Sequence, residues 1–146
     1  MHMSTQMVVF KLSNEDFAVE VSSVEAIIKL QAITKVPHAQ PHVVGVTNLR
    51  GNIVPVIDLK KRLSLPATDN SIDTRIIVAL LQESKVGMVV DAVSQVIEID
   101  DAQIEDTPQL STNVDSSFIR GIVKIENLLV IMLDLAKIFS DEKIKN

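Results

Sequence analysis

The sequence contains no cysteine, no tryptophan and no tyrosine, and only four glycines among its 146 residues. Without cysteine the chain forms no disulfide, no thiol nucleophile and no thiolate metal site, which suits a reducing compartment and makes the cytoplasm the default location. The glycines stand at positions 45, 51, 87 and 121. Glycines so far apart do not form a loop that cradles a phosphate, so nucleotide binding has no support.

Long apolar runs and concentrated positive charge are also missing. The longest uninterrupted apolar runs, residues 76–81 and 128–133, contain six residues each, whereas a transmembrane helix needs about 20. The 14 basic residues are scattered among 19 acidic ones, and the net charge is -5. Such a chain lacks the basic patch that binds a nucleic-acid backbone or an anionic lipid surface. We therefore expect neither nucleic-acid binding nor membrane insertion.

The residues that are abundant favour β-structure. Valine and isoleucine, at 20 and 17 residues, make up 37 of the 146 positions, and β-branched side chains favour strands. Hydrophobic residues are 47% and charged residues 23% of the chain, values typical of a folded globular domain. The composition therefore predicts an all-β protein.

The chain also repeats itself. A strand, a polar turn and a second strand recur at an offset of 69 residues, and the glycine and two apolar strands that follow recur at an offset of 76. The difference of seven residues falls on the polar segment 107–113, which is typical of a loop. The sequence thus predicts an internal duplication, with copies at about residues 7–63 and 76–139.

Each copy has the size of a small β-barrel and buries little core by itself. We therefore expect one barrel from each copy, both packed around a shared core in a single domain that covers residues 7–140. Residues 64–75 are predicted to connect the two barrels. Residues 1–6 and 141–146 are predicted to be flexible termini.

Both copies end at an aspartate, Asp58 in the first and Asp134 in the second, followed by a short helical pattern. A carboxylate at this position accepts the free N–H groups of a first helical turn, so we predict a short helix after each aspartate. The two aspartates also invite interpretation as a catalytic acid pair. Helix capping accounts for both equivalent positions and is the favoured interpretation.

Other candidates for chemistry are weak. His38 and His42 stand four residues apart, but the prolines at 37 and 41 break the helix that a shared metal would need, and no third ligand is near. The pair Asp100–Asp101 suggests the metal site of a response-regulator receiver, yet that fold needs long helices where this chain has short polar turns. We expect a solvated turn there, and no catalytic residue, metal or cofactor.

One segment stands out, GVTNLRGNIVPVIDL at residues 45–59. It closely resembles the signature of the CheW family, the chemotaxis coupling proteins, in which an NLRG turn leads into a PVIDL strand. The resemblance extends from about Met7 to Phe139. Residues 86–93 look like the second-barrel strand of the family, and residues 119–121 with 131–135 look like its closing strand.

The resemblance implies a non-enzymatic adaptor of two SH3-like five-stranded barrels. Such proteins bridge the cytoplasmic tip of a methyl-accepting chemoreceptor to the regulatory domain of the histidine kinase CheA, at receptor arrays on the membrane. In the family the first barrel docks onto the kinase domain, the second can join another copy, and a groove between the barrels holds the receptor tip. The alternatives are a CheW-like module of another receptor-kinase pathway, such as surface motility, and a fragment of a larger coupling protein.

The resemblance also gives candidate protein-binding residues. Arg50 offers a planar fork of five donors at a turn that Gly51 permits, and acts on a partner directly or through a first-barrel carboxylate. Asn48 is predicted to hold the turn through side-chain to backbone bonds. The full set of candidates is Val24, Glu25, Ile27, Asn48, Leu49, Arg50, Gly51, Val89 and Val90, where for at least one of the last two core packing is the favoured role.

The sequence departs from the family pattern near Val24. The family commonly has glutamate two places after this valine, where this chain has Ala26, while Glu25 stands one place earlier. In a strand a shift of one residue turns a side chain to the opposite face. A pair between Arg50 and Glu25 is therefore in doubt.

Overall fold

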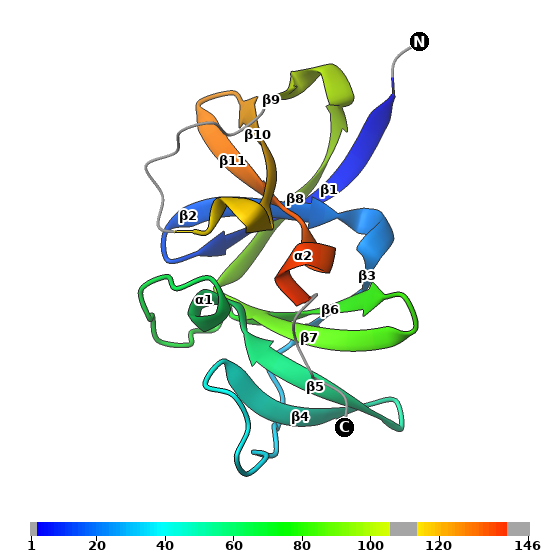
Figure 1. The fold of residues 1–146 in the computed structure, drawn as a ribbon, viewed down its shortest axis with the longest axis vertical. Coiled ribbons are helices and arrows are strands. Elements are labelled where there is room, and N and C mark those ends of the chain that lie inside the picture. Colours follow the sequence, from blue (N-terminus) through cyan, green and yellow to red (C-terminus); the bar gives the residue numbers. More distant parts are fainter. Residues whose placement is uncertain (1–2, 106–113, 140–146) are drawn as a thin grey trace.

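The computed structural model describes residues 3–105 and 114–139 and consists mainly of strands in two sheets, drawn one above the other in Figure 1. The upper sheet contains β1 (Ser4–Leu12), β2 (Glu15–Glu20), β8 (Ala92–Asp100), β9 (Ile104–Glu105), β10 (Ile119–Ile125) and β11 (Leu128–Leu133). The lower sheet contains β3 (Val24–Lys29), β4 (Val43–Leu49), β5 (Asn52–Asp58), β6 (Arg75–Leu81) and β7 (Ser84–Val90). The predicted all-β fold is confirmed, with a two-residue sixth strand, β9, added to the upper sheet.

The strand order shows that the two copies of the repeat exchange their first hairpins. The upper sheet has the order β8-β1-β2-β11-β10-β9 and the lower sheet the order β3-β6-β7-β5-β4. The parallel pairing of Met132 with Ala18 in the upper sheet is matched by that of Val56 with Gly87 in the lower sheet, at equivalent repeat positions. The expectation that each copy closes its own barrel is therefore wrong. The hydrophobic pattern of the sequence predicts where strands form. It does not specify whether the adjacent strand in the sheet comes from the same copy or from the other.

The boundaries of the domain differ slightly from the prediction. β1 begins at Ser4, before the predicted start at Met7, because Ser4 pairs with Asp100 of β8 and its hydroxyl donates to Glu98 at 2.6 Å. Residues 4–6 thus form part of a strand instead of a flexible terminus. The predicted loop at 107–113 and the predicted tail at 141–146 lie outside the described residues.

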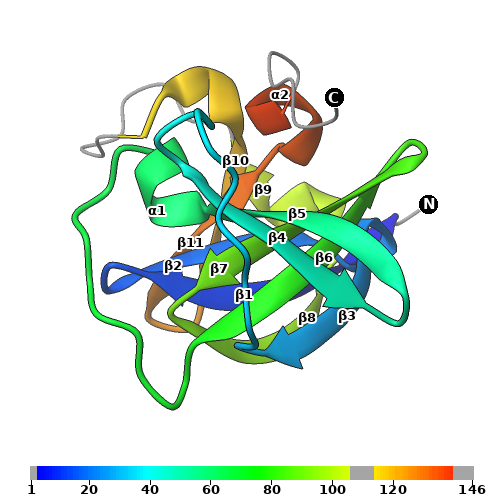
Figure 2. The same cartoon turned by 90° about the horizontal axis from the view of Figure 1, so that it is seen from below.

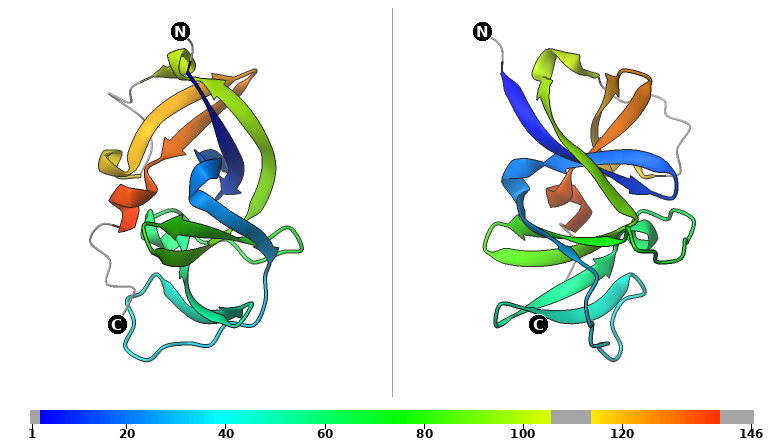
Figure 3. Two further views of the ribbon diagram at one scale, coloured as in Figure 1. Left: turned by 90° about the vertical axis from the view of Figure 1, so that its right-hand side faces the viewer. Right: turned by 180° about the vertical axis from the view of Figure 1, so that it is seen from behind.

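A shared core lies between the two sheets, which Figure 3 shows stacked in side view. Phe10 and Phe17 of the upper sheet, whose ring centroids are 6.3 Å apart, pack in the same cluster as Ile57 and Met88 of the lower sheet. All four side chains are fully buried. Each sheet also encloses a smaller cluster of its own. Because the shared core contains side chains of both sheets, the two sheets form one body.

Two short helices follow the strands that end each copy. They are α1 (Leu59–Arg62) and α2 (Leu135–Phe139). The Asp58 carboxylate accepts from the Lys61 N–H at 3.3 Å, and Asp134 accepts from the Lys137 N–H at 3.1 Å. The predicted helical turns and their caps are confirmed. From α1 the predicted connector runs along one side of the molecule to β6 (Figure 2).

Candidate functional site

Arg50 and Gly51 form the two-residue turn of the β4–β5 hairpin, between the register partners Leu49 and Asn52. Their φ angles are 52° and 85°, the positive pair of a type I′ turn. The Gly51 N–H donates to the Asn48 side-chain oxygen at 3.0 Å. Asn48 therefore holds the turn as predicted.

The hairpin tip is also fixed to the segment that follows β3. The Gln31 side-chain amide donates to the Asn48 carbonyl at 2.7 Å and to the Thr47 hydroxyl at 2.8 Å. The Thr47 hydroxyl, which is buried, donates in turn to the Ala32 carbonyl at 2.7 Å. These bonds make the tip a rigid platform, which lowers the entropy lost when a partner docks.

Arg50 is exposed on this platform. Its side chain forms no ion pair or hydrogen bond with any described residue. A residue other than glycine at positive φ is uncommon and carries a backbone cost of about 1 kcal/mol or more. The turn therefore holds Arg50 in an unfavourable backbone conformation, while its five side-chain donors face solvent without a partner among the described residues.

Exposed apolar surface lies at the same end of the lower sheet. β5 and β7 run parallel, so the β4–β5 and β6–β7 hairpin turns project on the same side, as Figure 1 shows. Ile53, directly after the Arg50 turn, is 66% exposed, and Leu80, close to the other turn, is 43% exposed. An arginine beside exposed aliphatic side chains is a composition typical of protein interfaces.

The candidates on β3 take different directions because the register between β3 and β6 shifts between Val24 and Ala26. Val24 packs against the shared core, and Ile27 is 40% exposed. Glu25 is exposed and pairs with Lys85 of β7 at 3.0 Å. Glu25 therefore pairs with Lys85 and not with Arg50.

The two valines of β7 are not surface residues. Val89 is 7% exposed and packs with Val56 and Leu49 inside the lower sheet, while Val90 is fully buried in the shared core. Their burial favours core packing, the role preferred for at least one of them, and contact between Val89 and a partner stays a prediction. Their strand also belongs to the lower sheet and not to a second barrel formed by the second copy alone.

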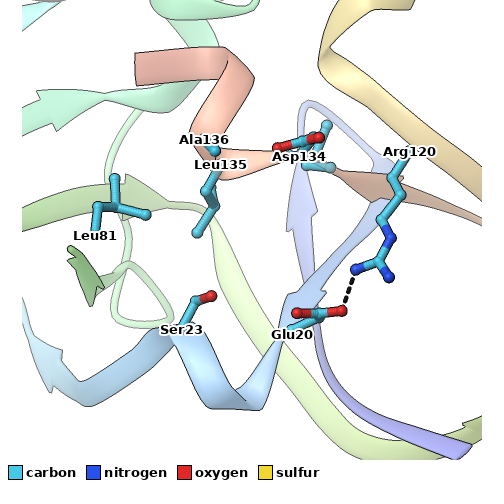
Figure 4. A pocket seen from close by; sticks show the side chains of 8 residues that line it. Glu20, Ser23, Leu81, Arg120, Asp134, Leu135 and Ala136 are labelled. Atoms are coloured by element: carbon cyan, nitrogen blue, oxygen red, sulfur yellow. Dashed lines mark hydrogen bonds and ion pairs between the residues drawn. The ribbon is translucent and has the colours of Figure 1, made fainter. Parts of the chain in front are cut away.

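A second site lies where the two sheets meet. It is a pocket of about 220 Å³, drawn in Figure 4, whose walls come from the ends of β2, β6 and β11, from β10, from the turn after β2 and from the start of α2. The residues that line it are Glu20, Ser23, Leu81, Arg120, Leu133, Asp134, Leu135 and Ala136. It occupies the place between the barrels where the resemblance implies a groove.

The pocket combines an apolar floor with a polar end. Leucine and alanine side chains form the floor, and Arg120 and Glu20 form an ion pair at one end (Figure 4). The Arg120 and Glu20 side chains remain 47% and 29% exposed, so solvent screens the pair and a partner can exchange for either member. This arrangement suits an amphipathic helix better than a small polar substrate.

None of the nine candidates from the sequence lines this pocket. Arg120 and Asp134 belong to segments that carry the family resemblance, and Asp134 also stands out as the predicted cap of a short helix. Asp134 itself is engaged as the cap of α2, as Asp58 is for α1. Asp100 caps a short 3₁₀ turn and accepts from the Ala102 N–H at 2.9 Å, which agrees with the predicted turn.

Residues 3–105 and 114–139 are the part of the chain that the structure describes. That part of the chain holds no group of three or more histidine or carboxylate side chains suited to a metal ion. None of its helices has the length and apolar character that crossing a membrane requires.

Comparison with known proteins identifies similar chains. The family model described as a CheW-like domain matches residues 6–143. The chemotaxis protein CheW of Bacillus subtilis is 38% identical over 138 residues, which cover 94% of this chain and 88% of that protein. The chemotaxis protein CheW of Rhizobium meliloti is 33% identical over 138 residues, which cover 94% and 89%.

A solved structure shares the whole fold. The crystal structure of the scaffolding protein TtCheW from Thermoanaerobacter tengcongensis superposes with a TM-score of 0.88 at 38% sequence identity. The match covers 99% of this chain and 92% of that chain. It therefore includes both sheets, the Arg50 hairpin and the pocket between the sheets.

Proposed function

Since the chain belongs to the CheW-like domain family and is a chemotaxis coupling adaptor, we propose that it joins the regulatory domain of a CheA-type histidine kinase to the cytoplasmic tips of methyl-accepting chemoreceptors. The observation that carries this proposal is the presence, on one body, of two separate surfaces with the composition of protein-binding sites. One is the Arg50 hairpin tip, and the other is the pocket between the sheets. Two such surfaces let an adaptor raise the effective concentration of one partner at the other.

The kinase domain docks on the tip of the β4–β5 hairpin. Arg50 supplies charged donors without an internal partner to release, and Ile53 supplies apolar area beside it. Asn48 and Gly51 act by holding the turn. Leu49, half-buried beneath the turn, supports it from the core of the lower sheet.

The receptor tip docks in the pocket between the sheets. An apolar ridge of a receptor helix covers Leu81 and Leu135, while an acidic or basic side chain of the helix engages the exposed Arg120 and Glu20 pair. This contact places the adaptor in the cytoplasm at membrane receptor arrays. We assign it to chemotaxis and not to surface motility, because the relatives named above are chemotaxis proteins.

A second copy of the chain is a further partner. Glu126, at the tip of the β10–β11 hairpin, is the repeat equivalent of Arg50 and has nearly the same φ, 55° against 52°. The two tips carry opposite charges and equivalent exposed aliphatic residues, Ile53 at 66% and Leu129 at 53%. Complementary tips on one chain support head-to-tail association, which closes into rings or extends into filaments.

The adaptor acts by binding alone, without catalysis, metal or cofactor. The Asp58, Asp100 and Asp134 carboxylates cap short helical turns, and the Asp101 carboxylate accepts from the Thr5 hydroxyl. These bonds give each carboxylate a structural role.

Calorimetric titration tests the proposal with two ligands, the kinase regulatory domain and a helical receptor-tip fragment. We expect wild-type protein to bind both, and Arg50→Ala to weaken kinase binding about tenfold or more, as for an interface arginine, with receptor binding unchanged. Glu126→Ala, at the equivalent turn of the other hairpin, is the matched control and retains kinase binding. Kinase binding by Arg50→Ala at wild-type affinity would overturn the assignment.

A further inference from the structure

The repeat gives the molecule two equivalent junctions between its sheets, and only one of them is open. At the open junction the pocket is lined by Leu81 and by Leu135 and Ala136 of α2. The repeat equivalents of these residues, at offsets of 69 and 76, are Leu12 and the α1 residues Leu59 and Lys60. These line the corresponding position at the other junction.

The two junctions differ in solvent access. Leu81 is partly exposed in the pocket, whereas its equivalent Leu12 is fully buried. Ala136 is exposed, whereas its equivalent Lys60 is only 3% exposed, despite a long charged side chain. A lysine buried to this extent is rare unless it is paired. Something therefore covers the α1 junction that does not cover the α2 junction.

The cover is the start of the connector, residues 64–68. Leu65 packs against the shared core. The Pro66 carbonyl accepts from the Ser13 hydroxyl of the β1–β2 turn at 2.5 Å, and the Thr68 hydroxyl accepts from the Lys60 ammonium at 2.5 Å. The connector is thus held to one sheet by Ser13 and to the other by Lys60.

Asp91, between β7 and β8, completes the attachment. Its carboxylate pairs with the Lys60 ammonium and accepts from the Thr68 hydroxyl at 2.9 Å and from the Ser13 N–H at 2.8 Å. Burial raises the pKa of Asp91, but the hydrogen bonds from Lys60, Ser13 and Thr68 and the Lys60 charge outweigh it and leave the pKa below its ordinary value. Asp91 therefore remains ionised at neutral pH and keeps Lys60 neutralised.

We propose that connector residues 64–68 plug a second groove, equivalent to the open pocket, and limit the adaptor to one receptor tip. The proposal rests on the proposed function in taking the receptor tip as the ligand of the open pocket. The walls of both grooves descend from the same repeat, so a groove that loses its plug presents the same backbone frame, with Leu12 and Leu59 in place of Leu81 and Leu135. Its polar end differs, because Val44 and Val89 stand where the open pocket has Arg120 and Glu20. The connector thus acts as an internal competitor that sets the valency of the adaptor at one.

Thiol labelling tests the plug without any partner, because the chain has no cysteine of its own. Three variants each carry one cysteine reporter. Leu12→Cys lies in the plugged groove, Leu81→Cys in the open groove and Val123→Cys in the core of the upper sheet. Each is combined with the unlatching pair Ser13→Ala/Lys60→Ala, in which position 60 copies Ala136. Lys61→Ala, a neighbouring exposed lysine of α1, is the control background.

We expect unlatching to raise the labelling rate at position 12 at least tenfold, and to leave the fast rate at 81 and the slow rate at 123 within about twofold of the control. An unchanged rate at position 12 overturns the plug. A tenfold rise at position 123 as well shows global opening and also overturns it, because the connector would then act as ordinary core.

Calorimetry with the receptor-tip fragment tests the second site. We expect wild-type protein and Lys61→Ala to bind one fragment and the unlatched protein to bind two. A stoichiometry of one in an unlatched protein whose position 12 labels fast overturns the limit on valency. Absence of fragment binding by wild-type protein contradicts the proposed function instead, and labelling then still decides whether the connector is a plug.

Discussion

Glu25 forms an ion pair with Lys85 at 3.0 Å, across β6, and leaves Arg50 without a partner among the described residues. The register shift at the start of β3 turns Glu25 toward Lys85 of β7. The pair is about one-third exposed on both sides, so it adds little to stability. Its main consequence is that no carboxylate has to be displaced before Arg50 engages a partner.

Replacement of Arg50 by glycine separates folding from binding. Glycine adopts the φ of 52° without strain, and this gain roughly offsets the greater entropy of glycine in the unfolded chain. We expect the free energy of unfolding of Arg50→Gly to stay within about 1 kcal/mol of wild type, while affinity for the kinase domain falls about tenfold or more. Urea unfolding and calorimetry measure the two quantities. Parallel loss of both would show that Arg50 serves the fold.

Two glycines of the lower sheet differ in their tolerance of alanine. A Cβ on Gly51 meets no atom within 4 Å, so Gly51→Ala carries only the cost of a φ of 85°, about 1 to 2 kcal/mol. A Cβ on Gly45 lies 2.1 Å from the Thr34 carbonyl oxygen. We expect Gly45→Ala to destabilise the protein by about 3 kcal/mol or more, since backbone must move. Chemical denaturation of both variants measures the order, and a reversed order would contradict the close approach of residues 34 and 45.

Much of the fold follows from the sequence because repetition and capping are local patterns. The positive φ of Ser13 and Gln82, and of Arg50 and Glu126, occurs at equivalent positions of the two copies. The exchange of hairpins is not visible in such patterns. It depends on long-range strand pairing, and the local patterns of the two copies fit either neighbour equally well.

The site was predicted only in part, for a related reason. The Arg50 turn is encoded by adjacent residues, and a motif finds it. The pocket is assembled from four segments that the chain order separates, and its apolar residues have the same pattern as core residues. Val89 and Val90 show the converse case, in which apolar strand residues proposed as contacts lie buried in the core.

Filling the pocket separates the two binding functions. Ala136 is exposed at the start of α2, so Ala136→Arg places a long charged side chain over the apolar floor without disturbing the core. We expect affinity for the receptor-tip fragment to fall about tenfold or more, with kinase binding unchanged. Ala102→Arg, at an exposed alanine of the 3₁₀ turn Asp101–Gln103 between β8 and β9, is the control. Equal receptor binding by both variants would place the receptor tip elsewhere.

Charge exchange tests association between copies. Arg50→Glu and Glu126→Arg each place like charges on facing tips, which costs affinity. We expect each single variant to sediment as monomer at concentrations where wild-type protein associates, and the double variant, with its charges exchanged, to recover association. A double variant as monomeric as either single variant would show that the two tips do not meet.

Asp91 gives stability a pH dependence of known sign. Its pKa is lowered from the ordinary 3.8 by the bonds from Lys60, Ser13 and Thr68, which outweigh burial. The unfolded chain therefore takes up the proton first as the pH falls, so the stabilisation is complete well above 3.8 and is lost as the pH drops through the folded-state pKa. Lys60 is the charged group that faces Asp91 in the described contacts.

We expect Asp91→Asn to be less stable than wild type by about 3 kcal/mol near pH 7, because Lys60 then stays buried without its counterion. As the pH is lowered below 3.8 and through the folded-state pKa of Asp91, this difference should shrink, since wild-type Asp91 then becomes neutral as well. Urea unfolding of both proteins across the series measures it, and the other carboxylates cancel in the difference. A difference that stays constant to the lowest pH would mean that the Asp91 charge does not hold the connector in place.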